Sequence, residues 1–174
     1  MVELELTYLA KTLPPNLQDF PSKRIVDLYV NNGTDHADLR IRQNGDSYEL
    51  TRKIPVEASD ASKQIETTIA LNQTEFESLS DTKSHKVEKT RYFFDHEGRT
   101  AEFDVFEGDL AGLVVIDFEF DEEREKQLFT MPEFCLADIT QEDFIAGGMI
   151  AGKSYESLKS HLDKFGYKRL ELDL

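Results

Sequence analysis

The chain has 174 residues, of which 32% are charged and 39% are hydrophobic, and its formal net charge is −15 at pH 7. These values are typical of one globular domain with a core of its own, here residues 1–174. The negative charge argues against binding to a nucleic-acid backbone, and no apolar run reaches the roughly 20 residues that a membrane helix needs.

The N-terminus and the cysteine content indicate where the protein resides. The opening stretch "MVELELTYLA" is acidic from its third residue, which argues against a signal peptide. The single cysteine, Cys135, excludes an internal disulfide framework and a cysteine-based zinc cluster. We therefore expect a cytoplasmic protein that associates with neither membranes nor nucleic acids.

Alternation of apolar and polar residues predicts strands along most of the chain, because successive side chains of a strand point to opposite faces. The strands are expected at residues 2–6 and 23–30 and in three hairpins, over residues 38–54, 86–106 and 101–120. The hairpin turns are placed near Gly45, Gly98 and Gly108, where the sequence supplies turn residues. Together these runs give seven or eight strands.

Helices are expected at only a few places, namely residues 72–80, 140–146 and 154–166. In the first of these, Thr74 and Glu77 have the spacing of a capping box. The third is the clearest, because Ser154 can cap its start and Gly166 can end it. The acidic run at residues 121–127 is expected to be a solvated loop or the start of a helix. Many strands with few helices predict a mainly β fold, either a barrel or a strongly curved sheet.

Charged side chains recur at alternate positions of the expected strands, and each row is almost pure in sign. The acidic rows contain Glu3, Glu5, Glu102, Asp104, Asp117 and Glu119, and the basic rows contain Arg40, Arg42, Lys53, Lys89 and Arg91. Solvent exposure explains any single row, because antiparallel sheets commonly have one wet face. Surface strands usually mix Thr, Ser, Gln and Lys, however. The purity of all the rows together therefore favours a sheet that closes with the charges inside.

An interior of this kind has a specific chemistry. Enclosed charges must be paired, hydrated or balanced by bound ions. Carboxylates are the oxygen ligands that Mg²⁺ and Mn²⁺ prefer, and clustered Arg and Lys side chains bind phosphate oxygens. The two kinds of row therefore predict a metal–phosphate site.

The order of these motifs resembles the CYTH superfamily, the triphosphate tunnel metalloenzymes, whose members include class IV adenylate cyclases, thiamine triphosphatases and bacterial inorganic triphosphatases. "VELEL" resembles the N-terminal Glu-x-Glu-x-Lys signature, and "LRIRQNGDSYELTRK" resembles the Arg-x-Arg hairpin that ends in Thr-x-Lys. "IETTI" resembles the next, acidic strand, and "EKTRYFF" the Lys-x-Arg strand. "AEFDVFEGDLAGLVVIDFEF" is similar to the family's most recognisable hairpin, and "LADITQEDFIAGGMIA" to its C-terminal region.

The resemblance implies an eight-stranded antiparallel closed β-barrel around a charged tunnel, with a few accessory helices. It implies a triphosphate-containing small molecule as substrate, bound by Arg40, Arg42, Lys53, Lys89, Arg91 and Glu66. It also implies Mg²⁺ or Mn²⁺ bound among Glu3, Glu5, Glu102, Asp104, Asp117 and Glu119. The candidate catalytic residues are Glu3, Glu5, Lys53 and Lys89. Family members are often homodimers, so a homodimer is a further expectation.

The sequence departs from the family pattern at Thr7, at Gln64, which occupies a position that is often acidic, and in "FIAGG", which lacks the Arg and Asn common near the C-terminus. Thr7 stands where the resemblance places a lysine, to which a part in activating the attacking water has been assigned. The function predicted is a metal-dependent phosphohydrolase acting on inorganic or organic triphosphates. Three alternatives stay open: an adenylate-cyclase-like lyase using ATP, a non-catalytic module that binds polyphosphate or nucleotides, and an acidic sheet protein whose charges face water. Thr7 favours the binding module, whereas nothing in the sequence indicates an adenine pocket for the lyase.

Overall fold

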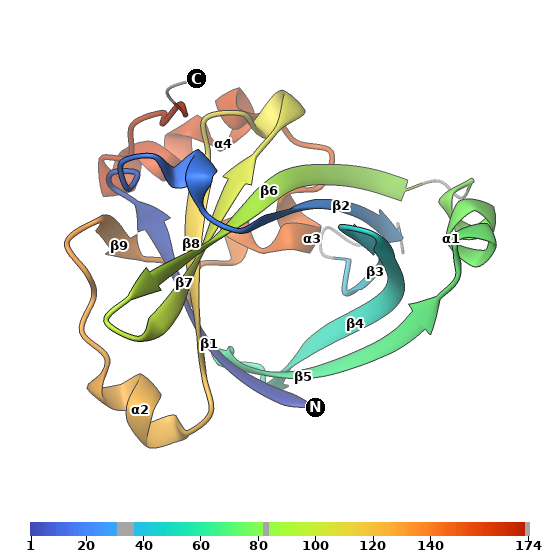
Figure 1. Ribbon diagram of the computed structural model, residues 1–174, viewed down its shortest axis with the longest axis horizontal. Coiled ribbons are helices and arrows are strands. Elements are labelled where there is room, and N and C mark those ends of the chain that lie inside the picture. Colours follow the sequence, from blue (N-terminus) through green and yellow to red (C-terminus); the bar gives the residue numbers. More distant parts are fainter. Residues whose placement is uncertain (31–36, 82–83, 173–174) are drawn as a thin grey trace.

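The computed structural model describes residues 1–30, 37–81 and 84–172. Within these ranges, eight antiparallel strands close into a barrel in the order β1-β5-β4-β3-β2-β6-β7-β8 (Figure 1). The strands are β1 (Val2–Ala10), β2 (Ser22–Val30), β3 (Leu39–Asn44), β4 (Ser47–Glu57), β5 (Asp60–Leu71), β6 (Ser84–His96), β7 (Arg99–Phe106) and β8 (Val114–Phe120). Pairing of Val2 with Ile65, between β1 and β5, closes the ring. The predicted eight-stranded barrel is confirmed.

The predicted hairpin turns lie where glycine supplies the backbone conformation they need. The two-residue turn between β6 and β7 has positive φ at both Glu97 (54°) and Gly98 (81°), as a type I′ turn requires. Gly45 between β3 and β4 also has a positive φ, of 61°. The β7–β8 connection is longer, because the short 3₁₀ helix η2 (Gly108–Leu110) is inserted into it.

The sequence did not predict a ninth strand, β9 (Cys135–Asp138), which pairs with the end of β1 outside the ring. Only four residues long, it alternates too briefly to be recognised from its pattern. Two short 3₁₀ helices, η1 (Leu17–Asp19) and η4 (Asp163–Phe165), complete the connections. Among the described helices, none has the length and apolar composition that crossing a bilayer requires.

The helices correct the sequence-based expectations in two places. Helix α1 (Gln73–Ser80) is capped by Asn72, whose side chain accepts a hydrogen bond from the Glu75 backbone while the Glu75 side chain accepts one from the Asn72 backbone. The Thr74–Glu77 capping box was therefore wrong, because the helix begins before Thr74. The segment expected to form a helix at 140–146 contains only the 3₁₀ helix η3 (Asp143–Ile145), and the one-turn helix α3 (Gly147–Ile150) follows it.

The acidic run at 121–127 was expected to be a solvated loop or the start of a helix, and helix α2 (Glu123–Leu128) does begin in it. Lys126 on that helix, however, is buried rather than solvated. The Lys126 Nζ donates a hydrogen bond to Ser62 Oγ at 2.6 Å, which connects α2 to the beginning of strand β5. Helix α4 (Tyr155–Leu162) agrees with expectation: Ser154 caps it, the 3₁₀ helix η4 continues it, and Gly166, with φ 69°, ends η4.

Two apolar cores hold the barrel. The first joins inward residues at one end of the barrel, such as Val87 and Phe106, to Leu158 and Leu162 of α4. The second lies outside β7 and β8, where Phe103 and Phe118 pack with other aromatic side chains. The remainder of the barrel interior contains no apolar core, and there the site is found.

Candidate active site

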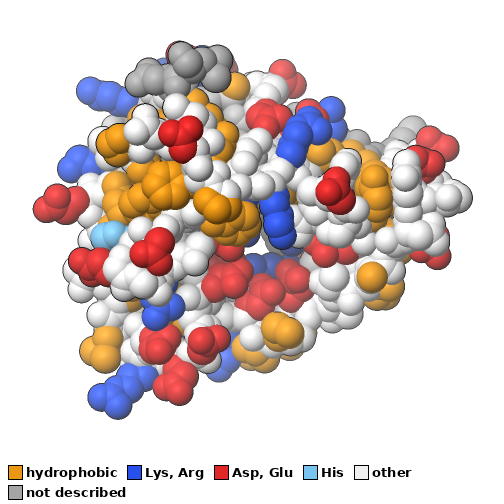
Figure 2. All heavy atoms as spheres, viewed as in Figure 1, with side chains coloured by type: hydrophobic (Ala, Val, Ile, Leu, Met, Phe, Trp, Pro, Cys, Tyr) orange, Lys and Arg blue, Asp and Glu red, His pale blue; other side chains and the backbone are white. Residues whose placement is uncertain are grey.

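A central cavity of about 430 Å³ occupies the barrel interior and is lined mainly by charged side chains. Figure 2 shows a hollow in the middle of one face, with acidic side chains gathered around it and basic ones visible within. Of the described residues that line the cavity, eleven are acidic and five are basic. The acidic ones are Glu3, Glu5, Asp27, Asp38, Glu49, Glu66, Asp104, Asp117, Glu119, Glu142 and Asp143, and the basic ones are Arg40, Arg42, Lys53, Lys89 and Arg91.

The topology sorts these charges onto two walls. The strands with the predicted acidic rows, β7, β8 and β1, are consecutive in the barrel although they are distant in the sequence. The basic residues come from β4 and β3, on the other side of the ring, and from β6, which pairs with β7. Side chains at alternate positions face inward, so the period-two rows seen in the sequence become the cavity walls.

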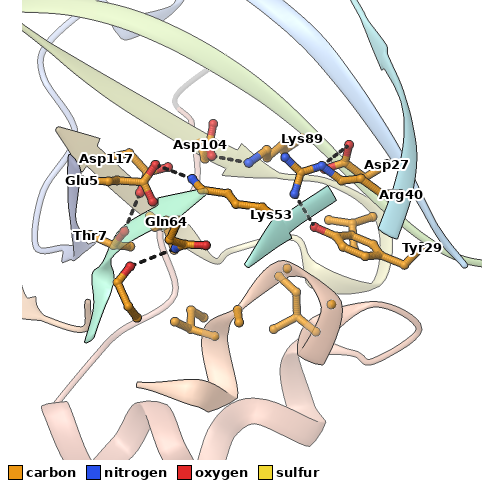
Figure 3. A pocket seen from close by; sticks show the side chains of 18 of the residues that line it. Glu5, Thr7, Asp27, Tyr29, Arg40, Lys53, Gln64, Lys89, Asp104 and Asp117 are labelled. Atoms are coloured by element: carbon orange, nitrogen blue, oxygen red, sulfur yellow. Dashed lines mark hydrogen bonds and ion pairs between the residues drawn. The ribbon is translucent and has the colours of Figure 1, made fainter. Parts of the chain in front are cut away.

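Lys53 bridges the two walls at one place. From β4 its Nζ reaches two carboxylates of β1: it lies 3.0 Å from Glu5 Oε2 (Figure 3) and 3.1 Å from Glu3 Oε2. Burial alone would lower the pKa of Lys53 and raise that of Glu5. The mutual attraction outweighs burial, so the pKa of Lys53 is raised and the pKa of Glu5 is lowered. Both groups are therefore charged at neutral pH.

Asp104 is the centre of a second charge cluster. It accepts hydrogen bonds from Arg91 Nε at 2.6 Å and Nη2 at 2.7 Å, and from Lys89 Nζ. Arg91 also pairs with Glu102 and, at 3.1 Å, with Asp117. Burial would raise the pKa of Asp104, but Arg91 and Lys89 outweigh it and hold the pKa well below its usual range. Burial, with the repulsion of neighbouring arginines, lowers the pKa of Lys89.

A third cluster contains two residues that the sequence did not single out, Asp27 and Tyr29 of β2. Asp27 accepts hydrogen bonds from Arg42 Nε at 2.6 Å and Nη2 at 2.8 Å. Arg40 Nε lies 3.7 Å from Asp27, and Arg40 Nη1 donates to the Tyr29 hydroxyl at 3.4 Å (Figure 3). Asp27 was not recognised from the sequence because it is a single acid in a mostly apolar strand. The only indication that it faces the cavity was its place among the alternate positions whose side chains point inward.

Thr7 lines the cavity beside Asp117, a buried carboxylate with a raised pKa. Its hydroxyl donates a hydrogen bond to Asp117 Oδ1 at 2.9 Å. Burial and the negative charges of Glu5 and Asp104 raise the pKa of Asp117 to about 7, against the attraction of Arg91. A proton or a cation at this point therefore relieves repulsion between carboxylates.

The donor chemistry of the acidic wall fits a divalent cation. Burial raises the pKa of Glu119, as do the charges of Glu102, Glu5 and Glu3, and burial likewise raises the pKa of Glu102. Crowded carboxylates of this kind are the oxygen ligands that hard divalent ions take. In the part of the chain that the structure describes, no three His, Cys, Asp or Glu side chains are arranged to hold a metal ion. Lys53 and Arg91 instead bridge the acids.

The structure brings together the residues that the sequence proposed. All of them line the central cavity except Glu102, which lies in an adjoining hollow with Glu119 and pairs with Arg91. Glu66 lies on the basic side, with one oxygen 3.7 Å from Arg40 Nη2. Glu49 was overlooked although it shares the inward parity of Lys53. Asp38 and Glu142 come from loops, and Asp143 begins the short 3₁₀ helix η3, so no periodicity reveals their positions.

Comparisons with known proteins agree with this geometry. The family model of the CYTH domain matches residues 14–142. The chain is 34% identical over 145 residues to an inorganic triphosphatase of Nitrosomonas europaea, covering 82% of this chain and 91% of that protein. It is also similar to the crystal structure of an inorganic triphosphatase, with a TM-score of 0.63, 28% identity, and coverage of 87% of this chain and 95% of the other. A crystal structure of a hypothetical protein gives a TM-score of 0.64 at 29% identity, over 87% and 99% of the two chains.

Proposed function

Because the chain belongs to the CYTH domain family, we propose that it is a metal-dependent triphosphatase that binds its substrate inside the barrel. The observation that carries the proposal is the meeting of five basic side chains with a crowded acidic wall in one cavity. Clustered Arg and Lys side chains fit phosphate oxygens, and the carboxylates fit the cations that accompany a triphosphate. The similarity to an inorganic triphosphatase supports hydrolysis as the reaction.

The charge of the cavity supports a requirement for metal. With more acids than bases along the lining, the cavity repels a highly charged triphosphate unless cations enter with it. We assign Mg²⁺ or Mn²⁺ to the acidic wall, among Glu3, Glu5, Glu102, Asp104, Asp117 and Glu119. When bound, such an ion supplies Lewis-acid stabilisation of phosphate oxygens and a more acidic water.

The basic residues would neutralise the negative charge of the substrate. Arg40, Arg42, Lys53, Lys89 and Arg91 would bind non-bridging phosphate oxygens and neutralise the charge that develops on the transferred phosphoryl group. In phosphoryl transfer, positioning and electrostatic stabilisation of this kind supply most of the rate enhancement. Arg42, Lys53, Lys89 and Arg91 are each paired closely with a carboxylate, so the triphosphate replaces one anionic partner with another. Arg40 has longer contacts, at 3.7 Å from Asp27 and from Glu66. Glu3, Glu5, Lys53 and Lys89 stay the candidate catalytic residues.

The test is a panel of phosphate-release assays. Inorganic triphosphate, thiamine triphosphate and ATP are each incubated with Mg²⁺, with Mn²⁺ and with excess chelator, and cyclic AMP is measured in the same samples. We expect metal-dependent release of phosphate, abolished by the chelator. Cyclic AMP without phosphate would identify a lyase, and triphosphate binding without turnover would identify a binding module.

A matched pair of variants ties the activity to the cavity. Lys53→Met removes an inward cation from β4, and Arg52→Met removes its outward, exposed neighbour. Only the inward change should reduce phosphate release. Equal effects of the two variants would contradict the assignment of the site to the barrel interior.

A further inference from the structure

One buried carboxylate of the cavity belongs to neither the acidic wall nor the substrate set. Asp27 lies on β2, between the strands that carry the basic residues, and its side chain is only 3% exposed. Strand pairing places it directly opposite Arg42 of β3. The other buried side chains on the same face of its strand, Ile25 and Tyr29, are uncharged, and Lys23 on that face is exposed, so Asp27 is the single acid of this strand.

Both carboxylate oxygens of Asp27 accept hydrogen bonds from one guanidinium group, that of Arg42. Oδ1 accepts from Arg42 Nε at 2.6 Å and Oδ2 accepts from Arg42 Nη2 at 2.8 Å. Two parallel hydrogen bonds fix the plane of a guanidinium as well as its position. Glu49 also faces Arg42, but its nearest oxygen is 3.9 Å from Nε, so it contributes charge without fixing the orientation.

Arg40 is held in a different way. Its Nε lies 3.7 Å from Asp27 Oδ1 and, among the described residues, this buried nitrogen has no hydrogen-bond partner. Its other contacts are long, at 3.4 Å to the Tyr29 hydroxyl and 3.7 Å to Glu66. Asp27 therefore locks one arginine of the pair and leaves the donors of the other available.

We propose that Asp27 is the positioning residue of the basic wall: it orients Arg42 toward the transferred phosphoryl group and leaves Arg40 free to bind a phosphate oxygen. The inference rests on the proposed triphosphatase function for its reaction, but not for its geometry. Asp104 of β7 accepts hydrogen bonds from both Lys89 and Arg91 of β6, so each pair of basic residues has one buried carboxylate behind it, although only Asp104 bonds closely to both members of its pair. The role lies in orientation, and the negative charge of Asp27 itself opposes the substrate.

This role predicts a split between the kinetic constants. Asp27→Asn keeps the shape of the side chain but can accept only one of the two hydrogen bonds from Arg42. The turnover number for inorganic triphosphate should fall roughly 10- to 100-fold, as expected for a misplaced group. The Michaelis constant should not rise, because the variant removes a charge that repels the substrate. Glu49→Gln is the matched control: it removes the same charge beside Arg42 but no fixing contact, so its turnover number should change far less.

A double-variant cycle separates positioning from charge or folding effects. If Asp27 acts through Arg42, then Arg42→Lys, which keeps the charge but not the two parallel bonds, should lower the turnover number by a similar factor. The double variant should be no worse than Arg42→Lys alone. Multiplying losses, or an unchanged turnover number in folded Asp27→Asn, would overturn the proposal. If Asp27→Asn does not fold, Asp27→Glu replaces it in the same cycle, because it keeps the charge and moves the carboxylate by one methylene.

A readout without turnover keeps this inference distinct from the proposed function. In ¹⁵N-labelled protein, the Nε–H resonance of Arg42, assigned by its loss in Arg42→Lys, should be sharp and protected from exchange. It should broaden or exchange rapidly in Asp27→Asn but not in Glu49→Gln. If wild-type protein releases no phosphate from any triphosphate, the proposed function fails while this measurement still decides the role of Asp27. An Arg42 resonance unaffected by Asp27→Asn would refute the positioning role whatever the activity.

Discussion

Apolar and acidic residues alternate along strand β8, so its outer and inner faces differ in chemistry. Ile116 and Phe118 point outward, are fully buried, and pack in the second core. Asp117 and Glu119 point inward and line the central cavity. One strand thus separates a region held by packing from a region governed by electrostatics. Substitutions at neighbouring positions should therefore affect different properties of the molecule, and the predictions below test that separation.

The largest effect on stability should come from the outer face. The Phe118 ring lies 4.6 Å from the Phe129 ring and 6.0 Å from the Tyr8 ring, measured between centroids. Phe118→Ala leaves a cavity in this cluster and should cost about 3–5 kcal/mol of unfolding free energy. Denaturant titration measures this loss. Phosphate release per folded molecule should stay close to that of the wild type, and a large loss of turnover in the folded fraction would break the separation.

The largest effect on activity should come from the inner face. Arg91 donates hydrogen bonds to Asp104 and Asp117 and lies in the cavity. Arg91→Ala should lower the catalytic efficiency by about 10²–10³-fold, the range seen when one donor to a charged transition state is removed. Its loss of stability should be smaller than that of Phe118→Ala, because Lys89 still pairs with Asp104. Unfolding of the variant with normal substrate handling by the folded fraction would show instead that Arg91 is structural.

The inner face should also respond to pH. Burial, Glu5 and Asp104 raise the pKa of Asp117 to about 7, whereas its ordinary value is 3.8. A raised pKa means that the folded state holds this proton more tightly, so its stabilisation is complete below pH 4 and is lost as the pH rises through about 7. One pKa unit corresponds to about 1.4 kcal/mol, so the metal-free protein should lose on the order of 2 kcal/mol of stability between pH 5 and pH 8.

Asp117→Asn provides the control for this titration. It removes the carboxyl group, so the slope of unfolding free energy against pH over that interval should decrease. Mg²⁺ should have a related effect in the wild type, because cation binding displaces the proton and offsets the repulsion. An unchanged slope in Asp117→Asn would show that another group titrates. Outer-face variants such as Phe118→Ala should keep the wild-type slope.

The separation of the two faces was largely visible in the sequence, but the pairing across the cavity was not. Period two placed Glu3, Glu5 and Lys53 on inward faces, and the order of motifs indicated a closed barrel. Which carboxylate meets which cation depends on how the ring closes: Lys53 reaches β1 only because β5 pairs with both neighbours. A strand pattern carries no information of that kind.

Isolated residues were harder to predict than rows. Asp27 is a single acid among apolar neighbours, so no repeated charge marked its strand as part of the site. Lys126 lies in an acidic, apparently solvated run, yet its amine is buried against Ser62. In both cases the tertiary partner determines the role of the residue, and that partner is far away in the sequence.

The smallest expected change concerns Thr7, the position where the resemblance to the family predicts a lysine. Thr7 shares the inner face of β1 with Glu3 and Glu5, and its hydroxyl donates to Asp117 at 2.9 Å. A hydroxyl provides one hydrogen bond but no positive charge, whereas an amine can also hold and orient water. Thr7→Lys should therefore raise the turnover number for inorganic triphosphate about tenfold, a small part of the 10²–10⁴-fold that a positioned acid or base contributes. It should also lower the pKa of Asp117 and flatten the pH dependence of stability.

Thr7→Met, of similar length but uncharged, should change neither the turnover number nor the pH dependence of stability. A fall in the Michaelis constant alone would mean that the new charge binds only the ground state. If both kinetic constants stay unchanged, the Thr7 side chain does not approach the phosphates, and the inner face of β1 takes part in metal binding alone.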